Sequence, residues 1–285
     1  MGVRLALLTT IGLAVIAPTI TSAKPRWQQL PIPPAMPAPA TTGHVDVGGA
    51  KIHYGTYGKG APVILLHGGL GNWDHFAFQL PALVDKFQVI VIDSRGQGRS
   101  TLTKTKLTYH LMAGDVLAVM DALKLERAAL VGWSDGGEIA LDLAIHSPER
   151  VERMFVFGAN YDAHGSKPRA GKRHETFDAY AVKCRRDYER VSKTPRAWSA
   201  LVDAMMPVWR NPAGFTKEQL KAIKAPTMMA DGEHDEVINL DQVREMATLI
   251  PNAKLAIFED TSHFALWQAP REFNQVLVEF LSATK

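Results

Sequence analysis

The sequence has little cysteine and little excess charge. A single cysteine in 285 residues, Cys184, cannot form an internal disulfide bond, and no group of Cys or His residues has the spacing of metal ligands. The 32 Lys and Arg residues against 29 Asp and Glu residues leave a net charge of +3, too small to indicate a nucleic-acid partner. We therefore exclude a disulfide scaffold and a zinc finger, and expect no metal ligands and no nucleic-acid partner.

The overall composition is that of a globular protein. Hydrophobic residues make up 46% of the chain and charged residues 21%, which argues against a disordered chain and against a protein with many membrane spans. The length of 285 residues suits one large domain or two small ones. A soluble enzyme or a ligand-binding domain is the expected class.

The one long apolar run lies at the N-terminus. Residues 5–20 are uncharged and apolar, follow Arg4, and precede small residues around a cleavage point near Ala23. An uncleaved membrane anchor is the alternative, but a spanning helix needs about 20 apolar residues, and this run is shorter and contains Pro18. We predict that residues 1–23 are a signal peptide and that the mature protein is periplasmic or secreted, with no membrane anchor after cleavage.

Proline marks the next segment. It recurs at positions 25, 31, 33, 34, 37 and 39, where it removes amide donors and favours extended backbone. Residues 24–42 are therefore predicted to be a stiff Pro-rich linker.

From residue 44 onward, short apolar runs alternate with longer amphipathic ones. This rhythm is typical of strands joined by crossover helices, and so of a mostly parallel sheet in an α/β protein. The expected strands are a hairpin at 44–57 and runs at 63–66, 88–93, 128–131, 153–157, 227–230 and 255–258. The expected flanking helices are 107–124, 136–147, 239–249 and 271–283.

One stretch, residues 164–224, breaks the rhythm because it holds no convincing strand. Its expected helices, near 175–192, 195–208 and 216–223, would lie over the carboxyl ends of the strands, where open α/β sheets bind ligands. Within it, residues 164–196 carry ten basic and four acidic side chains. We interpret the stretch as a cap, and leave open whether its basic residues contact substrate or form a solvated face.

The strongest chemical motif is GWSDGG, residues 132–137. It follows an expected strand and opens an expected helix, which is the setting of a G-x-S-x-G nucleophile elbow. Ser134 is the predicted nucleophile. Asp135 is the alternative nucleophile, but if Asp135 stood at the centre of the motif, Trp133 would occupy a position that needs a small residue. A structural reading, in which Ser134 only caps a helix, remains the other alternative.

A serine nucleophile needs a base, and the base needs a third group to orient it. His263 follows the last expected strand and precedes the last expected helix, so a loop can return its imidazole to the top of the sheet. For the acid we favour Asp235 over Asp231 and Glu233, because it lies deeper in its loop and can reach across to His263.

Two backbone amides are candidates for the oxyanion hole. One is the amide of Asp135, directly after the nucleophile, and the other is that of Gly69, in the glycine-rich loop 67–71. No Gly-Lys-Ser/Thr or G-x-G-x-x-G motif accompanies that loop, so nucleotide binding is not expected.

Taken together, these motifs resemble the α/β-hydrolase fold superfamily in order and spacing. The motifs that carry the resemblance are His67-Gly68-Gly69, Asp93-x-Arg95-Gly96-x-Gly98-x-Ser100, the elbow at Ser134, Asp235 and His263. The resemblance implies an eight-stranded, mostly parallel sheet flanked by helices, a small helical cap inserted after strand six, and a Ser-His-Asp triad that acts through an acyl-enzyme without a cofactor. It divides the chain into a hydrolase core at 43–163 and 225–285 and a cap at 164–224, and treats Asp93 and Arg95 as structural.

The elbow also resembles that of valacyclovir hydrolase-type enzymes. That resemblance implies that Asp135 recognises an α-amino group of the substrate. Trp73, Trp133 and Trp267 lie near expected loop mouths and are further candidates for substrate binding, although core packing is the commoner role of such residues.

The sequence thus predicts a secreted or periplasmic serine hydrolase of small carboxylic esters, with α-amino acid esters among the candidate substrates. Lactonase, carbon-carbon bond hydrolase and aminopeptidase activities of the same fold remain alternatives, because fold alone does not select a substrate. A non-catalytic ligand-binding protein is the alternative from a different class.

Overall fold

The computed structural model describes residues 23–168, 174–210 and 214–283. The predicted signal peptide lies outside the described residues except for Ala23. Within the described ranges, no helix is both long enough and apolar enough to cross a membrane.

The centre of the fold is one eight-stranded sheet with the order β1-β2-β4-β3-β5-β6-β7-β8. β1 pairs with β2 and β2 with β4 in antiparallel fashion, and the remaining neighbours are parallel, which confirms the expected mostly parallel sheet. The strands are β1 (Thr41–Val47), β2 (Ala50–Tyr57), β3 (Ala61–Leu66), β4 (Phe87–Ile92), β5 (Ala128–Trp133), β6 (Val151–Phe157), β7 (Thr227–Gly232) and β8 (Ala253–Phe258).

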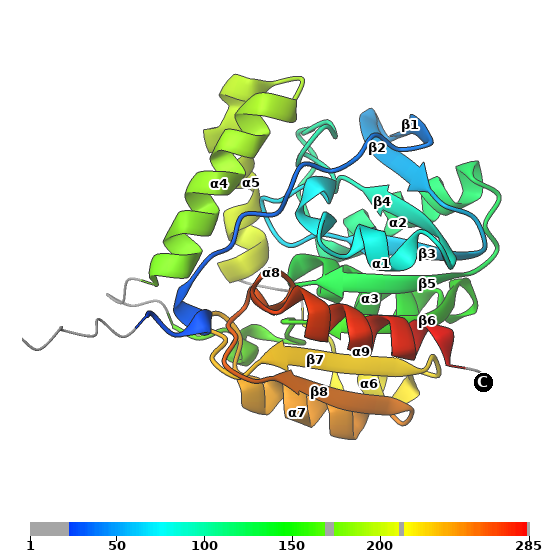
Figure 1. Ribbon diagram of the computed structural model, residues 1–285. Helices are drawn as coiled ribbons and strands as arrows, with labels where there is room; N and C mark the ends of the chain where they lie inside the picture. Colours follow the sequence, from blue (N-terminus) through cyan, green and yellow to red (C-terminus); the bar gives the residue numbers. More distant parts are fainter. Residues whose placement is uncertain (1–22, 169–173, 211–213, 284–285) are drawn as a thin grey trace, which may run out of the picture.

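Helices cover both faces of the sheet (Figure 1). One face packs against α2 (Tyr109–Ala122), α3 (Asp135–His146), α6 (Lys217–Ala222) and α7 (Leu240–Leu249), and the other against α1 (Leu80–Leu83), α8 (Ala265–Gln268) and α9 (Pro270–Ser282). Every residue of β5 is buried because this strand is central and covered on both sides. The continuously apolar runs of the sequence are explained by that double burial.

Two cap helices, α4 (Glu175–Val191) and α5 (Trp198–Arg210), stand at one end of the sheet (Figure 1). They follow β6 in the chain and contact the loops after β3 and β5: the Tyr180 hydroxyl donates to the Gly69 carbonyl, and the Trp209 indole donates to Asp135. The cap therefore lies over the carboxyl ends of the strands. α6, which we grouped with the cap, instead packs against α3 and α7 beside the sheet.

The Pro-rich segment, predicted as a linker, lies along the body of the protein (Figure 1, blue). Its short 3-10 helix η1 (Arg26–Gln28) is held by Arg26, whose guanidinium donates to the carbonyls of Glu259 and Asp260 and pairs with Glu272. Composition predicts the extended backbone of such a segment, but not the surface that holds it.

Candidate active site

Ser134 stands at a sharp turn between β5 and α3. Its backbone has φ 54° and ψ −124°, a conformation that non-glycine residues rarely adopt. The turn is closely packed, since a Cβ on Gly136 would lie 2.0 Å from the Leu66 carbonyl oxygen and one on Gly132 would lie 2.2 Å from that of Gly136. Every residue from 128 to 144 is buried except Ser134, which is partly exposed. The strained turn thus presents one accessible hydroxyl.

A buried Asp-His pair lies beside this turn. Asp235 Oδ2 is 2.6 Å from His263 Nδ1, and both side chains are buried. Burial would lower the pKa of His263, but the charge and hydrogen bond of Asp235 raise it above its ordinary value. Burial likewise would raise the pKa of Asp235, but the charge of His263 lowers it below its ordinary value. The contact leaves His263 Nε2 as the nitrogen free for proton transfer.

The two other acidic candidates, Asp231 and Glu233, lie away from the imidazole. Asp231 is buried, and burial together with the charge of Asp235 raises its pKa well above the ordinary value. Glu233 is exposed and accepts a hydrogen bond from the amide of Asp260. The structure therefore brings Asp235, and neither alternative, into contact with His263.

Contacts at the ends of β5 and β6 place His263 next to the elbow. The Trp133 indole donates to the His263 carbonyl at 3.0 Å, and the Ser134 amide donates to the Phe157 carbonyl at 2.8 Å. Gly158, the next residue after β6, has a φ of +60°, and a Cβ there would lie 2.9 Å from His263 Cε1. Only glycine fits at this position, because both the conformation and the imidazole exclude a side chain.

The glycine-rich loop after β3 also meets the elbow. A Cβ on Gly68 would lie 3.3 Å from the Ser134 Cβ. No acceptor among the described residues takes a hydrogen bond from the amide of Gly69 or from that of Asp135. Two unpaired amides that flank an accessible serine are the arrangement needed to receive a developing oxyanion.

His67 fixes this loop from behind. The Ser94 amide donates to His67 Nε2 at 3.0 Å, so Nδ1 carries the proton and donates to the Gly68 carbonyl at 2.8 Å. Burial lowers the pKa of His67 to about 3, which keeps the ring neutral. It is a structural histidine and not a second base.

The Asp135 carboxylate lies between the elbow, the loop and the cap. It accepts from the Tyr109 hydroxyl at 3.1 Å and from the Trp209 indole at 3.0 Å, and a Cβ on Gly69 would lie 2.6 Å from its Oδ2. Burial raises its pKa to about 6, against the lowering effect of those two hydrogen bonds. Asp135 is thus ionised at neutral pH and lies directly beside Ser134.

The three predicted substrate-binding tryptophans are packing residues, which corrects that prediction. Trp133 and Trp267 are 1% exposed, and their indole N–H groups donate to the carbonyls of His263 and His75. The Arg99 guanidinium carbon lies over the Trp73 ring, 4.0 Å from the centroid of that ring. The sequence predicted that these residues lie near loop mouths, but it did not predict which way their rings point.

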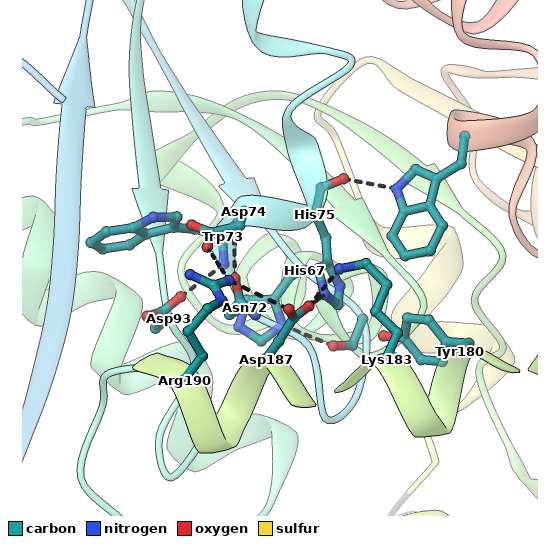
Figure 2. Close-up of polar contacts among 12 residues, drawn as sticks. His67, Asn72, Trp73, Asp74, His75, Asp93, Tyr180, Lys183, Asp187 and Arg190 are labelled. Carbon is teal, nitrogen blue, oxygen red and sulfur yellow. Dashed lines mark hydrogen bonds and ion pairs between the residues drawn. The ribbon is translucent and has the colours of Figure 1, made fainter. Parts of the chain in front are cut away.

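The cap is joined to the loop after β3 by a network of charged side chains. Figure 2 shows Lys183, Asp187 and Arg190 projecting from α4 toward the segment that carries Asp74 and His75. Asp187 lies 3.1 Å from the buried His75 Nε2 and 2.6 Å from Lys183 Nζ, while Arg190 lies 3.0 Å from Asp74. Part of the basic run therefore neutralises carboxylates of the protein itself.

Sequence reasoning missed four side chains around the site. Tyr109 and Trp209 hold Asp135, Tyr180 binds the Gly69 carbonyl, and Glu236 accepts a hydrogen bond from the His263 amide at 3.1 Å. Three of them lie on helices far from the motifs in the sequence, so no local pattern marks them. Only Glu236, next to Asp235, had a positional signal.

Comparisons with known proteins agree on fold and differ in substrate. The alpha/beta hydrolase fold family matches residues 61–171. The 2-hydroxy-6-oxo-6-phenylhexa-2,4-dienoate hydrolase of Comamonas testosteroni is 30% identical over 266 residues, which cover 83% of this chain and 93% of that protein. Among solved structures, the N-acyl homoserine lactone degrading enzyme Est816 is 31% identical with a TM-score of 0.66, over 83% of this chain and 99% of that one. A meta-cleavage product hydrolase from Pseudomonas fluorescens IP01 is 25% identical with a TM-score of 0.72, over 82% and 94%.

Proposed function

Because the chain belongs to the α/β-hydrolase family, we propose that it is a serine hydrolase of small carboxylic esters, with α-amino acid esters as the preferred class. The observation that carries the proposal is the strained, accessible Ser134 beside the buried Asp235–His263 pair. No cofactor is needed for this chemistry, because the three side chains supply the nucleophile, the base and its orienting group.

The reaction begins when Ser134 Oγ attacks the ester carbonyl carbon and transfers its proton to His263 Nε2. Asp235 holds Nδ1–H and stabilises the imidazolium, and the amides of Gly69 and Asp135 receive the negative oxygen. The imidazolium then protonates the leaving alcohol, which departs and leaves an acyl group on Ser134. Water, deprotonated by His263, attacks the acyl carbon and releases the acid.

The charge beside the nucleophile favours a cationic substrate. Asp135 has a pKa of about 6, so its carboxylate is mainly ionised at pH 7. Three of the four basic side chains of α4, those of Lys183, Arg185 and Arg190, each pair with a carboxylate, and the fourth, Arg186, is exposed. An α-amino group next to the scissile carbonyl would fit this field, and an anionic acyl group would not.

Carbon-carbon bond hydrolysis is the second candidate. It is supported by two relatives, a 2-hydroxy-6-oxo-6-phenylhexa-2,4-dienoate hydrolase and a meta-cleavage product hydrolase. The dienoate named for the first of these relatives is an acid, however, and the ionised Asp135 beside Ser134 disfavours such a substrate. Lactones share the carbonyl chemistry of esters and belong to the first candidate, as the lactone-degrading relative suggests.

The deciding experiment compares four substrates: an aryl butyrate, a valine ester, a lactone and a 2-hydroxy-6-oxo-dienoate. Ser134→Ala is the control, and it should lower kcat by about 10⁶-fold if the triad acts as a unit. Residual activity above a tenth of wild type would remove Ser134 from its role. A higher kcat/KM on the dienoate than on either ester would replace the proposal with the second candidate.

Amine recognition is tested separately by Asp135→Asn. This substitution keeps the side-chain volume and the backbone amide but removes the charge. We expect kcat/KM for the valine ester to fall at least about tenfold, the range for one lost charged contact, while the aryl butyrate changes little. Equal losses on both substrates would contradict a role for Asp135 in binding the amine.

We also propose that the enzyme acts outside the cytoplasm, from the apolar run at residues 5–20 and the small residues before Ala23. Expression of the full chain in a Gram-negative host, followed by fractionation and N-terminal sequencing, should give a periplasmic protein that begins at Lys24. A cytoplasmic or membrane-bound protein that retains Met1 would contradict this.

A further inference from the structure

A second cluster of chemically active side chains lies where α2 packs against α3, outside the candidate active site. His110 Nδ1 is 3.0 Å from Asp142 Oδ1, and His146 Nδ1 is 3.3 Å from the same oxygen. The three donor atoms all lie within 4.8 Å of one another. It is the only such convergence of three His, Cys, Asp or Glu side chains among the described residues.

The helices fix this geometry. Asp142 and His146 lie one turn apart on α3, so their side chains share a face. His110 lies in the first turn of α2, whose start is set by Thr108: its hydroxyl accepts from the Leu111 amide at 3.0 Å. The sequence predicted no metal ligands because His110 is 32 residues from Asp142, and the helix packing brings them together.

Among the described residues, the buried carboxylate of Asp142 has no permanently charged side chain beside it. Asp142 is 4% exposed, and no Lys or Arg of the described chain forms an ion pair with it. Its side-chain partners are two imidazoles, and the side chains of His110 and His146 are 72% and 42% exposed. A buried carboxylate is stable when a cation or several hydrogen bonds compensate it, and the exposed ring edges leave room for water ligands.

We propose that His110, Asp142 and His146 bind one divalent transition-metal ion of the Zn²⁺, Ni²⁺ and Cu²⁺ class. Two imidazoles and one carboxylate suit these ions better than Mg²⁺ or Ca²⁺, which prefer oxygen ligands. Donor atoms of a tetrahedral zinc site lie about 3.4 Å apart, close to the two N···O separations of the cluster. His146 Nδ1 also lies 3.1 Å from the Asp142 carbonyl oxygen, to which it donates a hydrogen bond in the ion-free protein. On binding, each neutral imidazole instead carries its proton on Nε2 and offers the Nδ1 lone pair to the ion.

The ion would join the start of α2 to the end of α3. Because the ligands are preformed only in the folded state, binding should raise the melting temperature, by about 5 °C at a free ion concentration one hundred times Kd. The hydrolase chemistry does not require the ion, since the cluster shares no residue with Ser134, Asp235 or His263.

The test is a calorimetric titration of the purified protein, without a polyhistidine tag and after dialysis against EDTA, with ZnCl2, NiCl2 or MgCl2. We expect one equivalent of Zn²⁺ or Ni²⁺ to bind with Kd on the order of micromolar, as is reasonable for three protein ligands, and no binding of Mg²⁺. His110→Ala and His146→Ala should each weaken binding at least tenfold and abolish the rise in melting temperature. Each variant loses one contact with the buried Asp142 carboxylate, so its melting temperature in EDTA is the reference for its own ion-induced rise.

His44→Ala is the matched control. His44 belongs to another surface pair, with its ring centroid 5.5 Å from that of His53 and Nε2 3.9 Å from Asp46, but its donors do not converge. It should bind like wild type. Absence of saturable Zn²⁺ and Ni²⁺ binding below about 1 mM, or equal binding by wild type and both single variants, would overturn the proposal.

Discussion

The buried carboxylate of Asp135 should make the stability of the protein depend on pH in a way that one substitution removes. Its pKa in the folded state is about 6, raised by burial from the ordinary value of 3.8. A carboxyl group whose folded pKa exceeds its unfolded pKa stabilises the fold below the lower value, and this contribution is lost as the pH rises through the higher one. Asp135→Asn is neutral at every pH and should not show this loss.

The magnitude follows from the two pKa values. The difference between about 6 and 3.8 corresponds to about 3 kcal/mol over the whole range, of which roughly 1 to 2 kcal/mol develops between pH 5 and pH 8. Buried carboxyls that Asp135 does not influence, such as Asp93 with a pKa also raised to about 6 by burial, are present in both proteins and cancel. Glu138 is the exception, because the charge of Asp135 adds to the effect of burial in raising its pKa well above the ordinary value. The cost of fitting an amide into the site is independent of pH and cancels as well.

The assay is urea unfolding of wild type and Asp135→Asn at pH 5 and pH 8. Relative to wild type, the variant should gain roughly 1 to 2 kcal/mol in free energy of unfolding on going from pH 5 to pH 8. Asp85→Asn, at an exposed site, should show no such gain. If the difference between wild type and Asp135→Asn is the same at both pH values, Asp135 does not titrate as a buried group and the argument for its charge at the active site fails.

Two pairs of substitutions test the packing around the site. Gly136→Ala would place a Cβ 2.0 Å from the Leu66 carbonyl oxygen and should lower the free energy of unfolding by at least about 3 kcal/mol. Gly114 lies in mid-helix with nothing within 4 Å of an added Cβ, so Gly114→Ala should raise the free energy of unfolding by up to about 1 kcal/mol. Thermal melting of the two variants distinguishes these effects. Asp187→Asn weakens the hydrogen bond between the carboxylate on α4 and the buried histidine of η2 (Trp73–Phe76) and should cost about 1 to 3 kcal/mol in urea unfolding. Glu189→Gln, which loses one exposed pair on the same helix, should cost under about 0.5 kcal/mol, and equal costs for the two would contradict a bracing role for the buried contact.

The sheet and the positions that meet at Ser134 were predictable because each is encoded locally. Apolar β-branched runs marked the central strands, and the glycine pattern marked the turn that follows β5. His263 and Asp235 could be placed because the carboxyl ends of parallel strands meet at one edge, so residues just after two strands become neighbours. The motif order along the chain was therefore sufficient to predict which residues the fold brings together.

The environment of the site was not predictable, because it depends on contacts between segments distant in sequence. No sequence feature near Asp135 predicts that Tyr109 and Trp209 donate hydrogen bonds to its carboxylate. The composition of the Pro-rich segment likewise does not predict the surface that Arg26 binds. The tryptophans failed for the same reason, since the direction of a ring is set by packing and not by position in a loop.

The substrate preference of this hydrolase therefore depends on residues that the motifs do not contain. The chemistry needs only Ser134 and its partners, which esterases, lactonases and carbon-carbon hydrolases of this fold have in common. In this chain, α5 of the cap places the Trp209 indole on the carboxylate next to the nucleophile. If Asp135 binds the ammonium group of the substrate, as we propose, that group has to share or replace the indole hydrogen bond, and the cap helix would then adjust the strength of binding. Trp209→Phe would free the carboxylate but also remove a hydrogen bond that lowers the pKa of Asp135, so the assay is run at pH 8, where the carboxylate stays ionised. There the variant is expected to lower KM for the valine ester while leaving the aryl butyrate unchanged, and a parallel change for both esters would assign Trp209 a packing role alone.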